Sequence, residues 1–212
     1  MMGIRGVLLD VDGTLVESND AHARAWVEAL SEYGFFIPFE LVRPLIGMGG
    51  DKLLPTVAPG LSSQAGVGQQ IVERRKIIFL QRYAPHLQPT PGARALIHQL
   101  HDDGLALAVA TSAQREELAT LLRAAGVADA SKPDADSIEA ALQRLQVRAA
   151  ETILLGDTPY DIAAGQKAGV ATIALRCGGF PDQDLAGALA LYDTPAALLA
   201  DYTSRRAPFR AE

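Results

Sequence analysis

The sequence predicts an α/β fold in which a doubly wound parallel sheet forms the core and an α-helical block is inserted into it. Two observations support this prediction. Strand-like and helix-like segments alternate over the second half of the chain, as in βα units. An isolated apolar segment, residues 4–9, precedes a long stretch, residues 17–88, that contains no convincing strand. The 212 residues can bury a sizeable core, and the length allows one or two domains.

The stretch without strands has the spacing of helices. From 19 to 33 the apolar residues recur every three or four positions, and Gly34 can end that helix. Short helical pieces are expected after Pro38 and Gly50, and a longer helix over about 62–83. This part of the chain should therefore fold as a helical domain.

The remainder of the chain alternates between strands and helices. The expected elements are helix 91–103, strand 105–111, helix 114–125, helix 134–145, strand 152–156, helix 159–168 and strand 170–175. With the first strand they make a discontinuous core of residues 1–16 and 89–212, and the helical domain spans 17–88. The two boundaries, near Val16 and Pro89, would be hinges.

Two carboxylates follow the first strand. Asp10 and Asp12 come directly after the apolar segment, and Gly13 follows them. A residue at the carboxyl end of a central strand lies where open α/β sheets bind ligands. Asp10 could attack phosphorus and carry it as an aspartyl-phosphate, and Asp12 could protonate the leaving group and later deprotonate water. The alternative is a β-turn that uses Asp-Gly because both tolerate unusual backbone angles.

The composition is that of a soluble enzyme. Hydrophobic residues make up 49% and charged residues 21%, which is far from the composition of disordered chains. A net charge of −6 argues against binding nucleic acid. No apolar run approaches the roughly 18 residues of a membrane span, and the first strand begins too early for a signal peptide. The single cysteine, Cys177, excludes an internal disulfide. We expect a cytoplasmic protein with no membrane partner, either a monomer or a weak dimer.

Three further motifs follow the first one in order. The second strand ends in Thr111-Ser112, Lys132 with a following proline opens a helical stretch, and the third strand ends at Asp157 with Asp161 four residues on. Together the four motifs resemble those of the haloacid dehalogenase superfamily of phosphatases and mutases. Each motif is weak alone, but four in the right order make a strong signal. The resemblance runs from about residue 4 to 202 and implies a Rossmann-like core with a helical, C1-type cap.

The resemblance also implies a metal site. The carboxylates of Asp10 and Asp157 and the main-chain carbonyl of Asp12 would hold Mg²⁺, which prefers oxygen ligands. Asp161 would lie behind them, orienting a metal-bound water or pairing with Lys132. The alternative for Asp157 and Asp161 is stabilisation of a helix N-terminus by negative charge.

The phosphoryl group would be held by residues of the second and third motifs. By resemblance, the Thr111 hydroxyl and the Ser112 N–H hold phosphoryl oxygens, and Lys132 supplies a fixed positive charge. The alternatives are a helix N-cap at Ser112 and a solvated surface lysine at Lys132.

The presence of an acidic residue at Asp12 helps to distinguish among the possible reactions. Dehalogenases and phosphonate-cleaving relatives lack an acid there, so Asp12 favours cleavage of C–O–P esters. We expect hydrolysis of small phosphorylated metabolites of the phosphoglycolate or sugar-phosphate type. A β-phosphoglucomutase-like phosphomutase is the second possibility. An inactive member that only binds a phosphorylated ligand is the third, although binding alone needs no acid.

Candidate substrate residues lie in the helical domain. His22 and Lys76 match a histidine and a cap lysine of the mutases; the alternatives are a polar residue on the helix for His22 and a solvated helix face for Lys76. Gly49 belongs to a glycine-rich turn that would let the backbone approach the substrate. Lys52 could replace an arginine that mutases carry in the matching loop.

The connection that leads to Lys132 is shorter than the resemblance implies. Relatives place a strand and a loop after the helix matching 114–125, whereas here Lys132 follows almost at once. About six residues, at most roughly 3.3 to 3.6 Å each, would have to bridge that distance, which is tight where parallel strands need crossovers. One possibility is that the connection is truly short, which puts in doubt both the strand that relatives place there and the position of Lys132. The other is that the numbering runs across an unobserved segment between Val127 and Lys132.

Overall fold

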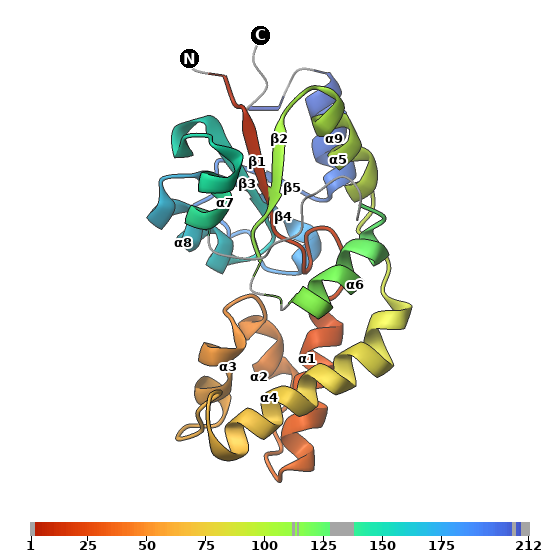
Figure 1. The fold of residues 1–212 in the computed structure, drawn as a ribbon, viewed down its shortest axis with the longest axis vertical. Coiled ribbons are helices and arrows are strands. Elements are labelled where there is room, and N and C mark those ends of the chain that lie inside the picture. Colours follow the sequence, from red (N-terminus) through yellow and green to blue (C-terminus); the bar gives the residue numbers. More distant parts are fainter. Residues whose placement is uncertain (1–2, 112, 114, 128–137, 205–206, 209–212) are drawn as a thin grey trace. The chain divides into compact units, whose positions relative to one another are not determined.

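The computed structural model describes residues 3–111, 113, 115–127, 138–204 and 207–208. Its contacts divide the chain into two compact units. The first, here called the core unit, comprises residues 1–17 and 88–212, and the second, the helical unit, comprises residues 18–87. Figure 1 shows a sheet in the core unit and only helices and turns in the helical unit.

The core unit contains a parallel sheet with the strand order β2-β1-β3-β4-β5. Its strands are β1 (Gly6–Leu9), β2 (Ala106–Val109), β3 (Thr152–Gly156), β4 (Ala171–Leu175) and β5 (Ala190–Tyr192). Every residue of β1 and β3 is buried, which explains why their sequences are almost continuously apolar. The α/β fold class with a doubly wound parallel sheet is thereby confirmed.

Helices cover both faces of this sheet (Figure 1). The helices of the core unit are α5 (Ala93–Asp102), α6 (Arg115–Ala125), α7 (Ile138–Leu145), α8 (Pro159–Ala168) and α9 (Pro195–Thr203), and its 3₁₀ turns are η4 (Ala149–Glu151) and η5 (Arg176–Gly178). Helix α7 contacts β1 and β2, and α8 contacts β3 and β4. Helices α5 and α9 pack against each other, α5 beside β2 and α9 beside β5. Leu8, Leu154 and Ile138 belong to one apolar cluster between α7 and the sheet.

The helical unit, all of which is described, contains no strand. Its elements are α1 (Asn19–Glu32), α2 (Phe39–Val42), η1 (Arg43–Leu45), α3 (Gly50–Val57), α4 (Gly66–Ile78), the π-helical turn η2 (Phe79–Tyr83) and η3 (Ala84–His86). Helix α1 packs against α4, and the side chains of Trp26 and Ile71 are buried. The expected helix over 62–83 is thus shorter, and its last part is wound as a π-helical turn.

Two segments of the core unit, residues 15–17 and 88–90, are hydrogen-bonded to each other and are here called the paired linkers. The Glu17 N–H donates to the Gln88 carbonyl at 3.0 Å, and the Thr90 N–H donates to the Leu15 carbonyl at 3.0 Å. Between these bonds Val16 and Pro89 form an antiparallel bridge. The chain therefore leaves and re-enters the core unit along one short two-stranded ribbon.

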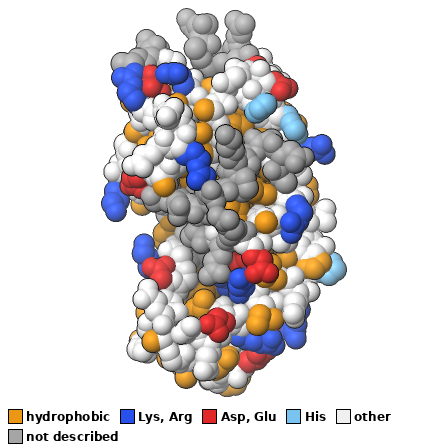
Figure 2. Space-filling view, in the orientation of Figure 1, with side chains coloured by type: hydrophobic (Ala, Val, Ile, Leu, Met, Phe, Trp, Pro, Cys, Tyr) orange, Lys and Arg blue, Asp and Glu red, His pale blue; other side chains and the backbone are white. Residues whose placement is uncertain are grey.

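The surface carries charges of both signs. On the face seen in Figure 2, basic and acidic side chains are interspersed with hydrophobic ones. Among the described residues, no helix combines the length and the apolar character needed to cross a membrane.

An ion pair just before β3 gives the fold a pH dependence that can be measured. Arg148 donates from Nε and Nη2 to the two carboxylate oxygens of Glu151, at 3.0 and 2.7 Å, and the Glu151 side chain is only 9% exposed. The guanidinium lowers the pKa of Glu151 from 4.5 to about 2. Because the folded-state pKa lies below that of the unfolded chain, the pair stabilises the fold above pH 4.5. That stabilisation is lost as the pH falls towards 2.

We therefore expect Glu151→Gln to lower the melting temperature at pH 7, with a deficit that narrows as the pH falls below 4.5. Thermal unfolding of both proteins, followed by circular dichroism over that pH range, checks this. A deficit of equal size at every pH would show that the loss comes from packing and not from the ion pair.

Candidate active site

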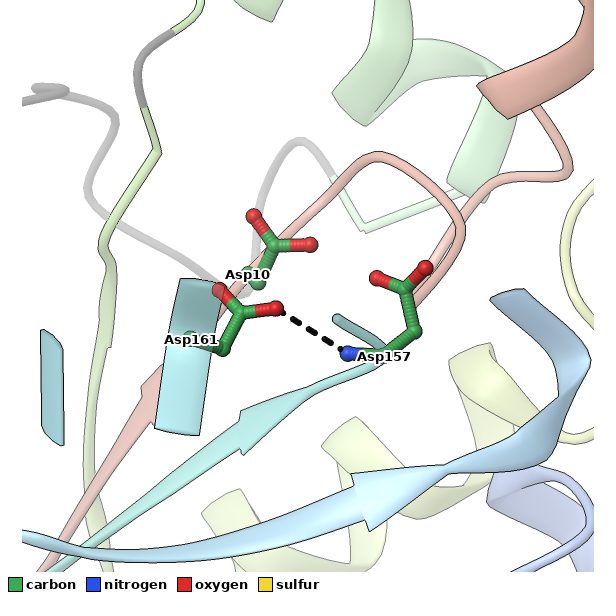
Figure 3. A group of neighbouring side chains, drawn as sticks. All are labelled: Asp10, Asp157 and Asp161. Atoms are coloured by element: carbon green, nitrogen blue, oxygen red, sulfur yellow. Dashed lines mark hydrogen bonds between the residues drawn. The ribbon is translucent and has the colours of Figure 1, made fainter. Parts of the chain in front are cut away.

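Three aspartates meet at the carboxyl ends of β1 and β3. Asp10 follows β1, Asp157 follows β3, and Asp161 lies in the first turn of α8 (Figure 3). One carboxylate oxygen of each lies within 4.8 Å of the others. The chain passes from β1 to β2 on one side and returns to β3 on the other side of β1. The cluster therefore lies at the switch point of the sheet, where α/β folds bind ligands.

The sheet itself fixes Asp10. Leu9 lies beside Val109 and Leu155, so β1 and β2 end at the same level and β3 ends one residue further on. The Asp10 N–H donates to the Leu155 carbonyl at 2.9 Å, which carries the hydrogen-bond ladder one residue beyond the strand. Thr111 comes two residues after β2 and lies at the same edge. This is where the sequence predicted phosphate contacts.

Asp161 is held by the start of its own helix. The Thr158 hydroxyl accepts a hydrogen bond from the Asp161 N–H at 3.1 Å, and Asp161 Oδ2 accepts one from the Thr158 N–H at 2.9 Å. The same oxygen accepts the Asp157 N–H at 3.2 Å, the dashed line in Figure 3. These bonds form a capping box at the N-terminus of α8, and they also fix Asp161 relative to Asp157.

The carboxylates in this cluster repel one another. Loss of hydration holds the pKa of Asp10 well above its usual value of 3.8, and the charges of Asp161, Asp157 and Asp12 raise it further. Burial also raises the pKa of Asp161, while its hydrogen bonds from Thr158 and Asp157 oppose this. A divalent cation would relieve such crowding, and carboxylate oxygens are the ligands that Mg²⁺ prefers. The donor set therefore fits that ion.

Two further residues near Asp157 were not predicted as site residues from the sequence. Thr14, fully buried, donates from its hydroxyl to Asp157 Oδ1 at 2.9 Å. Cys177 donates from Sγ to the Gly13 carbonyl at 3.3 Å, and burial raises the pKa of its thiol to about 12. For Thr14, the one available sequence signal was its position directly after the Asp10–Gly13 motif.

Several predicted residues fall outside the described part of the chain. Ser112 and Lys132 both do, so their predicted phosphate contacts stay predictions. The short connection from Val127 to Lys132 lies there as well, apart from Val127 itself. Asp12 is described and half-buried, in the loop that joins β1 to the paired linkers.

In the helical unit His22 lies against Phe79 and Arg75. The His22 ring is buried and stacks on Phe79 with centroids 3.8 Å apart, and Arg75 Nη1 lies 3.4 Å from His22 Nδ1. The guanidinium also lies over the Trp26 ring, 5.4 Å from its centroid. Arg75 was not among the residues predicted from the sequence, and any role of its neighbour Lys76 stays a prediction.

The other two candidates of this unit flank the start of α3. Gly49 has a φ of 89° and occupies the N-cap position of α3, a left-handed conformation that favours glycine. Lys52 is exposed in the first turn of that helix. Any contact that Gly49 or Lys52 makes with a substrate stays a prediction.

Comparison with known proteins agrees with this geometry. The family model described as haloacid dehalogenase-like hydrolase matches residues 4–169. Phosphoglycolate phosphatase of Rhodospirillum rubrum is 30% identical over 216 residues, covering 92% of this chain and 89% of the relative. The chain is thus an α/β hydrolase. It belongs to the haloacid dehalogenase-like hydrolase family, and the resemblance noted from the four motifs is confirmed.

Solved structures share the fold over nearly the whole chain. A putative beta-phosphoglucomutase from Bacteroides vulgatus superposes with a TM-score of 0.84 at 20% identity, covering 99% of this chain and 92% of that one. CbbY from Rhodobacter sphaeroides, solved in complex with phosphate, has a TM-score of 0.74 at 26% identity, covering 92% and 96%. At 20% identity, the likeness to the putative beta-phosphoglucomutase shows a shared fold alone.

Proposed function

We propose that this protein is a Mg²⁺-dependent phosphatase of small phosphorylated metabolites, of the phosphoglycolate or sugar-phosphate type, which works through a phosphoaspartate on Asp10. The observation that carries the proposal is the convergence of Asp10, Asp157 and Asp161 at the switch point of the sheet. The near full-length similarity to a phosphoglycolate phosphatase supports the choice of substrate class.

The proposed metal ligands are the carboxylates of Asp10 and Asp157 and the main-chain carbonyl of Asp12. Asp161, fixed by its capping box, would complete the negative surroundings of the ion. When bound, Mg²⁺ would neutralise the repulsion between a carboxylate nucleophile and a phosphate dianion.

Asp10 and Asp12 have different roles in the two chemical steps. Asp10 attacks phosphorus as the ester P–O bond breaks, and Asp12 gives its proton to the departing oxygen. Asp12 then takes a proton from a water molecule, whose oxygen attacks the phosphorus of the aspartyl-phosphate. Inorganic phosphate leaves and the Asp10 carboxylate is restored. Thr111, Ser112 and Lys132 are proposed to hold the phosphoryl oxygens throughout.

The helical unit is proposed to act as a cap that selects the substrate. Its place in the chain, between the first and second motifs, supports this role. His22, Gly49, Lys52 and Lys76 are its proposed substrate residues, and the contact with His22 adds Arg75. We further propose that the protein acts in the cytoplasm as a monomer or a weak dimer, in keeping with its acidic charge and single cysteine.

The test is a panel of phosphorylated acids and sugars assayed for phosphate release, with Mg²⁺ and again with EDTA. We expect at least one monoester to release phosphate when Mg²⁺ is present and release to stop when EDTA removes it. No bisphosphate activator should be needed, because water is the final acceptor.

Two outcomes would count against the proposal. Phosphate release that is undiminished in EDTA would show that the reaction does not depend on Mg²⁺. Conversion of β-glucose 1-phosphate to glucose 6-phosphate, detected with a coupled dehydrogenase, would replace the phosphatase by a phosphomutase.

A further inference from the structure

The carboxylate of Asp157 is enclosed by the protein on the side of the loop that follows β1. Asp157 and Thr14 are both fully buried, and a buried carboxylate is stable only when hydrogen bonds replace its lost hydration. Thr14 provides one, from Oγ1 to Asp157 Oδ1 at 2.9 Å. Hydrogen bonds to charged acceptors are stronger than neutral ones. This bond therefore fixes one oxygen of the carboxylate.

The other oxygen is enclosed by the 3₁₀ turn that follows β4. A Cβ atom placed on Gly178 would lie 1.9 Å from Asp157 Oδ2 and 2.5 Å from Asp157 Cβ. Carbon atoms do not approach so closely, so any side chain at this position would displace the Asp157 carboxylate or the turn. Gly178 itself is buried. The backbone at Gly178 thus limits where Oδ2 can go.

The two sides of this enclosure are joined to each other. Cys177, next to Gly178, donates from Sγ to the carbonyl of Gly13, next to Thr14. The turn after β4 and the loop after β1 therefore meet around Asp157 and are held together there.

We propose that Thr14 and Gly178 are positioning residues that hold the Asp157 carboxylate in one orientation before a metal ion binds, and so determine the affinity of the metal site. Groups behind a metal ligand commonly contribute tenfold to hundredfold to metal affinity by orienting that ligand. The inference rests on the proposed function, in which Asp157 is a metal ligand.

The test measures Mg²⁺ affinity in the absence of substrate, by isothermal titration calorimetry on the full chain. Thr14→Val keeps the side-chain shape but removes the donor, and we expect it to weaken Mg²⁺ binding by about tenfold or more. Thr14→Ser restores the donor and should keep most of the wild-type affinity. Thr203→Val removes an exposed hydroxyl that bonds only to carbonyls of its own helix, and should leave the affinity unchanged.

The Mg²⁺ dependence of activity is a second measurement, and it would not change if Thr14 only stabilised the fold. In Thr14→Val the Mg²⁺ concentration for half-maximal phosphate release should rise, while kcat at saturating Mg²⁺ changes far less. Melting temperatures in EDTA show whether each variant is folded. If Thr14→Val does not fold, Gly178→Ala carries the test, with the same expected loss of affinity.

The outcomes separate the two proposals. In one outcome the wild-type protein binds Mg²⁺ and a folded Thr14→Val or Gly178→Ala variant binds it equally well. That result would overturn the positioning role and leave the proposed function standing. Wild-type protein that binds no Mg²⁺ would overturn the metal assignment and this inference with it.

Discussion

Replacement of Asp10 by asparagine is expected to reduce phosphate release by more than about a thousandfold, a modest part of the acceleration that enzymes give to monoester hydrolysis. The amide cannot form an acyl phosphate and ligates metal poorly. The measurement is kcat for the best substrate of the panel, with Mg²⁺ at saturation. Activity of about a tenth of wild type or more would exclude Asp10 as the nucleophile.

The control for this variant is its stability without metal. The folded-state pKa of Asp10 is raised, so in the window above its usual value of 3.8 the folded chain binds more protons than the unfolded chain. The contribution of Asp10 to stability therefore falls as the pH rises through that window. A neutral amide avoids this cost, so in EDTA at pH 7 Asp10→Asn should melt no lower than wild type. A clear fall in its melting temperature would attribute the lost activity to misfolding.

Replacement of Asp12 by asparagine is expected to lower kcat by about a hundredfold to ten-thousandfold on alkyl phosphates, the usual worth of general acid–base catalysis. The loss should be much smaller on p-nitrophenyl phosphate in the phosphorylation step, because its leaving group departs as a stable anion without a proton. Single-turnover kinetics on both substrates measure this difference.

The main-chain carbonyl of Asp12 is retained in that variant, so Mg²⁺ affinity should stay close to wild type. Equal losses on the two substrates would contradict the role of Asp12 as the acid. A large loss of Mg²⁺ affinity would instead indicate that the carboxylate itself serves the metal.

The sequence predicted the centre of the sheet better than its edge. Strand β3 has the expected bounds, because both its faces are buried and its apolar run stops at a polar motif. Strand β5 was not predicted, since three half-buried residues give no usable periodicity. Helix α9 was missed too, although Thr194 caps it and Pro195 fills its first position, which are recognisable start signals.

The same contrast holds for the site. Asp10 could be predicted from its position at the end of an apolar strand, and Asp157 and Asp161 were grouped with it by the resemblance of the motifs. The partner of the Thr14 hydroxyl is 143 residues away, and nothing in the local sequence indicates it. Arg75 and Lys76 are adjacent cations that differ by about 100° around the helix axis. The packing of α4 against α1, which the local sequence does not indicate, brings Arg75 beside His22.

The paired linkers bear on how such a chain can change over evolutionary time. Because they run antiparallel, with Glu17 hydrogen-bonded to Gln88, the entry and exit points of the helical unit are adjacent. A hairpin turn from Glu17 to Gln88 would close the core unit without altering any strand of the sheet, and insertions are best tolerated at points of this kind. The helical unit is therefore a module that can be lengthened, exchanged or lost while the acidic centre is inherited unchanged. If the helical unit selects the substrate, as we propose, new substrate preferences can arise while the acidic centre is kept.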